Sequence, residues 1–214
     1  MSGDGFQTEQ ETFWAGQFGD EYISRNQGRH VLASNLAFFS RALAKTAKIQ
    51  SCIEFGANIG LNLQALKLLF PDQQQYAVEI NPDAARELHK VIPDQNVFET
   101  SILDFDPSIV AGAGGCDLAL TKGVLIHMNP AFLADVYRKL YNASKRYIMV
   151  CEYYNPTPTT VNYRGHTERL FKRDFAGEIM ELYPQLELLD YGFSYHRDRS
   201  FPQDDVTWFL MEKR

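Results

Sequence analysis

The chain has 214 residues, 45% of them hydrophobic and 22% charged, which predicts one well-buried globular domain over residues 1–214. A formal net charge of −6 disfavours a nucleic-acid partner, and no apolar run approaches the length of a membrane span. The first residues lack the basic and apolar regions of a signal peptide. Three scattered cysteines favour a reducing, cytoplasmic environment over disulfides or a cysteine-based metal site, and we predict no metal.

Residues 1–48 are predicted to form a helical segment ahead of the first strand. Apolar side chains recur at helical spacing over residues 31–43, which is typical of a helix packed against a sheet. Phe18, Tyr22 and Arg25 also have helical spacing. This segment is interpreted either as a cap over a ligand or as an ordinary amphipathic helix with a surface arginine.

Short apolar runs then alternate with helical segments, which predicts right-handed crossovers and a parallel sheet with helices on both faces. The last two runs, LELLDYGFSYH and DVTWFLMEK, are separated only by a short loop and predict an antiparallel hairpin. The expected fold is therefore α/β with a seven-stranded mixed sheet. Residues 155–173 form a long connection, which we interpret as a candidate lid over the α/β core of residues 49–214. The predicted strands lie at 52–55, 76–80, 96–100, 116–122, 146–154, 186–196 and 205–213.

Acidic residues stand at the carboxyl ends of three predicted strands, at Glu54, Glu79 and Glu152. Ligands of open parallel sheets bind beyond these strand ends. A carboxylate in an apolar strand end is costly unless it binds something, so the three together favour a ligand site. The alternative is that Glu54 belongs to a buried network and Glu79 is a solvated strand end.

The stretch IEFGANIGLN carries Gly56 and Gly60 in a turn between a predicted strand and a predicted helix. A G-x-G-x-x-G loop starting at Gly56 requires glycine at positions 58 and 61, where the chain has Asn58 and Leu61. These differences disfavour a dinucleotide such as NAD or FAD. Asn58 suits a turn because asparagine adopts left-handed φ more readily than other non-glycine residues.

This turn, followed by Glu79 on the next strand, resembles the first two motifs of class I methyltransferases that use S-adenosylmethionine. The resemblance implies a Rossmann-like fold, with S-adenosyl-L-methionine as cofactor and S-adenosyl-L-homocysteine as product. It implies that Glu54 and the turn hold the methionine moiety, with Glu54 paired to the ammonium group, and that Glu79 takes the ribose hydroxyls. The remaining cofactor contacts are assigned to Trp14 or Tyr22 beside the sulfonium, Arg25 on the carboxylate, and Ile80, Ser101, Ile102 and Lys122.

Three longer stretches carry a narrower resemblance. TEQETFWAGQFGDEYISRN, LTKGVLIHMNP and CEYYNPTPTTVNYRGHTERLFKRDFAGE are together similar to methyltransferases associated with pseudaminic acid biosynthesis, over residues 13–213. That resemblance implies an acceptor from a sugar-acid pathway.

Two residues are candidate catalytic bases, His127 after the fourth strand and Glu152 at the end of the fifth. A base matters for a hydroxyl or ammonium acceptor, and the alternative for His127 is a histidine satisfied by the backbone. The acceptor pocket is assigned to side chains of the fifth strand end and of the basic segment that follows it. These are Tyr153, Tyr154, Asn155, Arg164 and His166.

We therefore predict methyl transfer to an oxygen or nitrogen of a small, anionic acceptor, such as a sialic-acid-like sugar or its nucleotide derivative. The alternatives are a methyltransferase for an amino acid or another metabolite amine, and a non-catalytic module that binds the cofactor or a sugar. A reductase on a similar sheet is disfavoured by Asn58 and Leu61. No nucleic-acid or membrane partner is expected.

Overall fold

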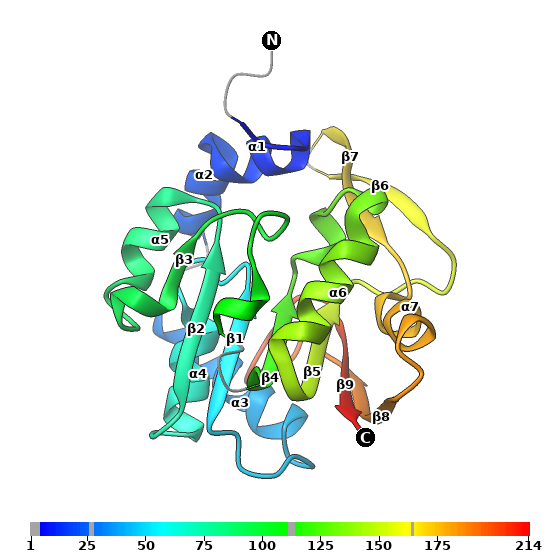
Figure 1. Cartoon of the computed structure of the whole chain (residues 1–214). Coiled ribbons are helices and arrows are strands. Elements are labelled where there is room, and N and C mark those ends of the chain that lie inside the picture. Colours follow the sequence, from blue (N-terminus) through cyan, green and yellow to red (C-terminus); the bar gives the residue numbers. More distant parts are fainter. Residues whose placement is uncertain (1–4, 26–27, 111–113, 164) are drawn as a thin grey trace.

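A computed structural model describes residues 5–25, 28–110, 114–163 and 165–214. Before the first strand, the described residues fold into α1 (Glu9–Ala15), α2 (Gln17–Arg25) and α3 (Arg29–Ala42). Helix α1 begins with a capping box, in which the Thr8 hydroxyl accepts from the Glu11 amide and the Glu11 carboxylate accepts from the Thr8 amide. Helices α1 and α2 lie beyond the end of the sheet, as Figure 1 shows.

Within the described residues, seven strands form one mixed sheet in the order β3-β2-β1-β4-β5-β9-β8. Neighbouring strands from β3 to β5 pair in parallel, whereas β9 is antiparallel to both β5 and β8. This confirms the predicted fold class, including the antiparallel C-terminal hairpin. The strands are β1 (Ser51–Phe55), β2 (Gln74–Glu79), β3 (Val97–Glu99), β4 (Cys116–Lys122), β5 (Ser144–Glu152), β8 (Leu186–Phe193) and β9 (Thr207–Lys213).

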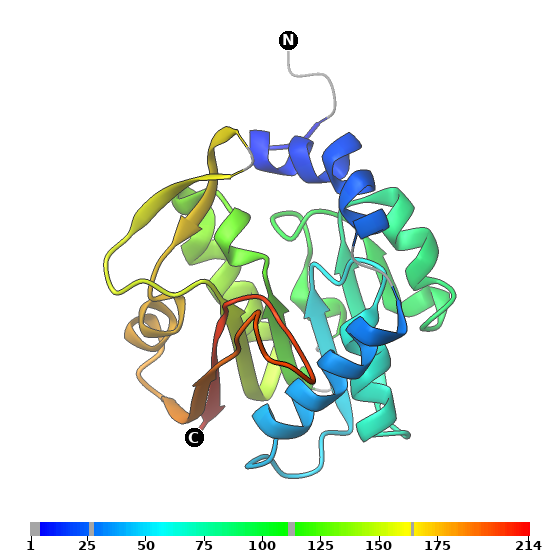
Figure 2. The same ribbon diagram turned by 180° about the vertical axis from the view of Figure 1, so that it is seen from behind.

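Helices cover both faces of the sheet and enclose one apolar core on each. Helices α3 and α4 (Leu61–Leu69) lie on one face, seen from behind in Figure 2, and contribute Phe38 and Leu66 to the first core. Helices α6 (Leu133–Ala143) and α7 (Phe175–Leu182) lie on the other face and contribute Tyr137 and Ile179 to the second. Among the described residues, no helix has both the length and the apolar character needed to cross a membrane.

Helix α5 (Pro82–Leu88) begins with an asparagine cap. The Asn81 side chain accepts hydrogen bonds from the amides of Asp83 and Ala84, and Pro82 occupies the first helical position. Asn129 likewise caps the 3₁₀ turn Pro130–Phe132, which leads into α6.

Residues 155–173 differ from the predicted irregular connection. They contain β6 (Thr159–Tyr163) and β7 (His166–Lys172), which pair as an antiparallel hairpin outside the main sheet. The physical reason is a run of β-branched residues at 159–161 followed by Gly165, whose φ of 87° suits a tight turn. The hairpin tip lies beside α1 in both views, where Gln10 Nε2 donates to the Glu168 carbonyl at 3.0 Å. A lid function for this hairpin stays a prediction.

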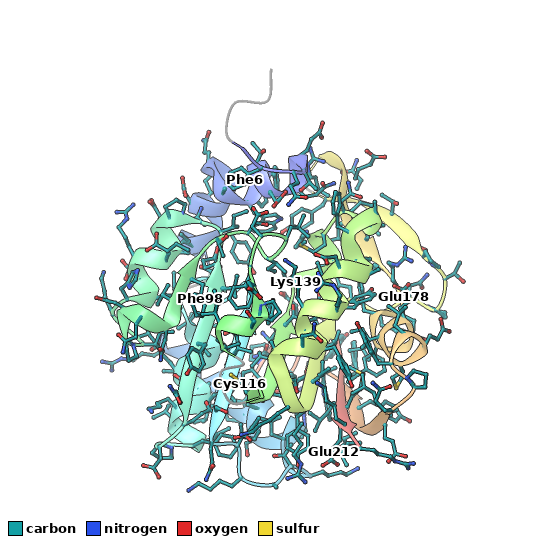
Figure 3. All side chains as sticks on the ribbon, in the orientation of Figure 1. Phe6, Phe98, Cys116, Lys139, Glu178 and Glu212 are labelled. Carbon is teal, nitrogen blue, oxygen red and sulfur yellow. The ribbon has the colours of Figure 1, made fainter. Side chains whose placement is uncertain are left out.

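The loop after β3 is held by a buried cation. Lys139 reaches from α6, near the centre of Figure 3, and donates to the carbonyls of Leu103 and Phe105, the latter at 2.8 Å. A buried ammonium group is tolerated because carbonyl oxygens and Asp135, at 3.7 Å, surround it. This contact fixes the path of the chain just beyond Ser101.

Candidate active site

A cavity of about 500 Å³ lies at the carboxyl ends of β1, β2 and β4. Its wall combines these strand ends with α1, α2, the start of α3 and the loop between β8 and β9. Many of the predicted site residues line it: Trp14, Tyr22, Gly56, Asn58, Glu79, Ile80, Ser101, Ile102, Lys122 and His127.

The turn after β1 owes its shape to residues in the left-handed region. Gly56 has φ 73°, and a Cβ at this position would lie 2.6 Å from Cγ2 of Val124. Asn58 has φ 49°, which agrees with the backbone role expected for this asparagine. Gly60 has φ 77° and lies beside Leu88, behind the cavity wall. Gly60 is not among the residues that line the cavity, and its predicted ligand contact stays a prediction.

The Glu79 carboxylate is held by two backbone amides. Oε1 accepts from the Asn81 amide at 2.8 Å, and Oε2 accepts from the Asn58 amide at 2.7 Å. Burial raises the pKa of Glu79, and these amide bonds oppose that shift. A carboxylate has four lone pairs, so the fixed Glu79 group keeps acceptor capacity for a ligand in the cavity.

Glu54 does not lie on the described cavity wall, although a direct ligand contact was predicted. It is fully buried, and its Oε1 accepts from Asn62 Nδ2 at 2.6 Å. Burial raises the pKa of Glu54 to about 8, and the Asn62 bond and nearby Lys122 oppose the shift. Asn62 lies on the wall instead, so the structure places this amide between Glu54 and the cavity.

Sequence reasoning therefore missed Asn62. Its position in the first turn of α4, directly after the glycine turn, is the feature that points to it. Its Oδ1 is buried and has no hydrogen-bond partner among the described residues, as is also true of Glu54 Oε2 and Asn58 Oδ1. Buried polar atoms are normally paired, so these unpaired atoms mark where a polar ligand would bind.

An aromatic cluster closes the cavity beneath α1 and α2. The Trp14 ring centroid lies 4.6 Å from that of His127 and 5.4 Å from that of Tyr22. Tyr163 of the β6–β7 hairpin also contacts His127, with centroids 5.1 Å apart. Trp14 Nε1 is buried without a partner among the described residues. The N-terminal helices and the hairpin therefore meet at His127.

One ring nitrogen of His127 is committed to the backbone. Nδ1 lies 2.6 Å from the Arg169 carbonyl oxygen, which only accepts, so Nδ1 carries the proton. That tautomer leaves the lone pair on Nε2. Burial lowers the pKa of His127 to about 4, so the ring is neutral near pH 7 and can accept a hydrogen bond from a ligand.

Glu152 has a different place from the predicted catalytic one. Its Oε1 accepts from the amides of Val124 and Leu125 at 3.0 and 3.1 Å, and Oε2 accepts from the Ile126 amide at 3.3 Å. Burial raises its pKa to about 7, and these bonds oppose the shift. The carboxylate lies behind the described wall because the 3₁₀ turn Leu125–His127 needs an acceptor for its first amides. Glu152 thus holds the turn that carries His127, and its catalytic role stays a prediction.

The predicted acceptor residues do not line the cavity where they are described. Tyr153 packs against both apolar cores under Lys172, Tyr154 is exposed beside Phe209, and Asn155 bonds to Thr157 and Thr159. The physical reason is that these side chains have their partners elsewhere in the protein, at Lys172, Phe209 and the two threonines. Arg164 and the side chains of Arg25 and His166 lie outside the described residues.

A polar end of the cavity was not predicted. It lies between α3 and the β8–β9 loop, where Gln203 Nε2 donates to Asn35 Oδ1 at 2.9 Å. Both segments are far apart in the sequence, and no pattern in either indicates the contact. The residues of this end are His30, Ser34, Asn35, Lys122, His196, Gln203 and Asp204.

No protein-family model and no curated protein sequence matches the chain. Solved structures do match it. A SAM-dependent methyltransferase from Archaeoglobus fulgidus superposes with TM-score 0.66 at 12% identity, over 92% of this chain and 100% of that one. The chain has the class I methyltransferase fold. At such low identity this likeness establishes the fold alone.

Two further structures with this fold resemble the chain. The magnesium protoporphyrin IX methyltransferase of Synechocystis, solved with bound SAH, matches with TM-score 0.64 at 11% identity, over 96% of this chain and 100% of that one. A sugar N-methyltransferase from a Streptoalloteichus species matches with TM-score 0.63 at 13% identity, over 100% of this chain and 96% of that one. The narrower resemblance to pseudaminic acid methyltransferases stays a prediction.

Proposed function

We propose that this protein is a methyltransferase that uses S-adenosylmethionine and methylates an oxygen or nitrogen of a small acceptor. The observation that carries the proposal is the Glu79 carboxylate, fixed by the amides of Asn58 and Asn81 at the edge of the cavity. A fixed carboxylate that lines the cavity and keeps acceptor capacity suits the hydroxyls of a ribose. The methyltransferase fold and the SAH-bound Synechocystis structure support the same cofactor.

The unpaired polar atoms of the cavity fit the rest of this cofactor. Asn62 Oδ1, backed by Glu54, offers an acceptor for an ammonium group, and Lys122 offers a cation for a carboxylate. Trp14 supplies an aromatic ring for a sulfonium. When bound, S-adenosylmethionine supplies a methyl group already activated by its positive sulfur.

The chain's own contribution is alignment and proton acceptance. Helices α1 and α2 cover the cavity with aromatic rings, which exclude water from the reacting groups. Methyl transfer is an in-line displacement, so holding the acceptor in line provides much of the rate enhancement. His127 Nε2, whose lone pair is free because Nδ1 donates to Arg169, is placed to take a proton from a hydroxyl or ammonium acceptor.

The polar end between α3 and the β8–β9 loop is the proposed acceptor region. His30 and Ser34 at this end offer a ring N–H and a hydroxyl to an anionic acceptor, such as a sialic-acid-like sugar or its nucleotide derivative. The sugar N-methyltransferase with a similar fold supports a carbohydrate acceptor. Asp204 in the same wall favours the second candidate, methylation of an amino acid or another small amine.

Methyl transfer from radiolabelled S-adenosylmethionine to a panel of acceptors tests the proposal. We expect label to enter a sugar acid or nucleotide sugar, and not simple amines. Label in an amine alone would favour the second candidate. Cofactor binding without turnover, even with extracts containing the natural acceptor, would indicate a non-catalytic module.

A further inference from the structure

We propose that Glu11, in helix α1, selects the adenine base of the cofactor by accepting a hydrogen bond from its exocyclic amino group. This inference rests on the proposed function, because it concerns the nucleoside end of the same cavity. Glu11 is a charged residue in an N-terminal helix, far in sequence from the strand ends, and it is only 5% exposed. Such burial of a carboxylate calls for an explanation.

Glu11 lies on the cavity wall beside Ser101. Its carboxylate accepts a hydrogen bond from the hydroxyl of Ser101, which follows β3, and both residues line the cavity. The strand order places β3 next to β2 and β2 next to β1. The cavity wall therefore runs from the Gly56 turn, past Glu79, to Ser101 and Glu11. A nucleoside with its ribose on Glu79 and its amino-acid end at the turn directs its base toward Glu11.

The hydrogen bonds around the Glu11 carboxylate determine what kind of ligand group it can bind. Ser101 Oγ accepts from the Leu103 amide at 3.0 Å, so its own proton is directed to the Glu11 carboxylate. The Glu11 carboxylate is bound on its other oxygen by the Thr8 amide at 2.7 Å and the Thr8 hydroxyl at 2.9 Å. Oε2 accepts both Thr8 bonds, whereas Oε1 accepts only from Ser101 and keeps one lone pair, so the carboxylate recognises a donor through Oε1.

This part of the wall can distinguish a 6-amino purine from a 6-oxo purine. Ile80 and Ile102 also line the cavity, and they offer apolar surface to a purine. A 6-amino group donates to a carboxylate, whereas a 6-oxo group places lone pairs against lone pairs. A polar site rejects a ligand that leaves its buried groups unpaired. The wall therefore favours adenine over hypoxanthine or guanine.

Glu11 also closes the capping box of α1, so one carboxylate serves both the helix and the base. Cofactor binding is in this way linked to the position of the N-terminal helices. Glu9 lies between the two residues of the capping box and is exposed. It accepts a hydrogen bond from Arg169 at 2.8 Å and provides a matched control in the same helix.

The test compares binding of S-adenosylhomocysteine and its 6-oxo analogue, S-inosylhomocysteine, by calorimetric titration. We expect the wild-type chain to bind the amino form at least about tenfold more tightly. Glu11→Gln, whose amide can also donate, should reduce this ratio to about threefold or less, and Glu9→Gln should leave it unchanged. A double variant, Glu11→Ala with Ser101→Asp, should restore the preference, because it returns a carboxylate to the same place.

The outcomes separate this inference from the proposed function. If the wild-type chain binds neither compound, the proposed function fails. If it binds both equally, or if Glu11→Gln keeps the full preference, the role of Glu11 is overturned and the proposed function stands. If Glu11→Gln does not fold, the wild-type chain and the double variant still test the inference. Equal affinity of the wild-type chain for the two compounds, or no preference in the double variant, would overturn it.

Discussion

Glu54→Gln is predicted to stabilise the protein at neutral pH. Burial raises the pKa of Glu54 from its ordinary value of 4.5 to about 8. The folded chain therefore binds more protons than the unfolded chain between these two values. Because of this linkage, the contribution of Glu54 to the free energy of unfolding falls as the pH rises through that window.

The magnitude follows from about 1.4 kcal/mol per pKa unit. At pH 7 the ionisation cost is about 3 kcal/mol, and at pH 5 it is under about 1 kcal/mol. Glutamine is always neutral and avoids this cost. Glu54 Oε2 is buried and has no partner among the described residues. Protonated Glu54 and glutamine both place a donor there, so the cost of burying an unpaired donor is the same in both and cancels. The Asn62 hydrogen bond is kept in both.

Urea denaturation at pH 5 and pH 7 measures this difference. We expect Glu54→Gln to raise the free energy of unfolding by about 3 kcal/mol at pH 7 and by much less at pH 5. Glu181→Gln, on the exposed side of α7, is the control and should change neither value. An equal effect at both pH values, or a less stable variant at pH 7, would show that Glu54 is not a buried, destabilising carboxyl group.

Three further substitutions test the site. His127→Ala should lower turnover by about 100-fold or more and leave the Kd for S-adenosylhomocysteine near wild type; unchanged turnover would reduce the residue to packing. Glu152→Ala should lower the free energy of unfolding by at least about 2 kcal/mol, measured in urea, because it leaves three amides without their acceptor. Gly56→Ala should destabilise by at least about 2 kcal/mol through left-handed strain and contact with Val124, against about 1 kcal/mol for Gly114→Ala, where φ is also positive but nothing lies within 4 Å. Equal losses at the two glycines would contradict the steric argument.

The sheet could be predicted because its evidence is local. Each strand is a short apolar run, and caps such as Asn81 act on amides two and three residues away. The β6–β7 hairpin was missed because its strands are half exposed and rich in polar residues, so no apolar alternation reveals them. Its local indications were the β-branched run at 159–161 and the turn residue Gly165.

The site was only partly predictable, because strand ends are set by topology whereas side-chain partners depend on packing. Glu79 could be placed at the cavity from its position in the chain alone. Glu54 and Glu152 have the same kind of position, but each is turned to a protein partner, Asn62 in one case and the amides after β4 in the other. The Glu11–Ser101 contact joins segments 90 residues apart, which no local pattern indicates.

Calorimetric titration with S-adenosylhomocysteine is the most direct test of whether the cavity binds S-adenosylmethionine, and NADP represents the competing class of ligand. We expect one binding site for S-adenosylhomocysteine per chain. Glu79→Ala, which removes the carboxylate proposed to hold the ribose, should lower the affinity at least about tenfold. No detectable binding of S-adenosylhomocysteine, together with binding of NADP, would contradict it.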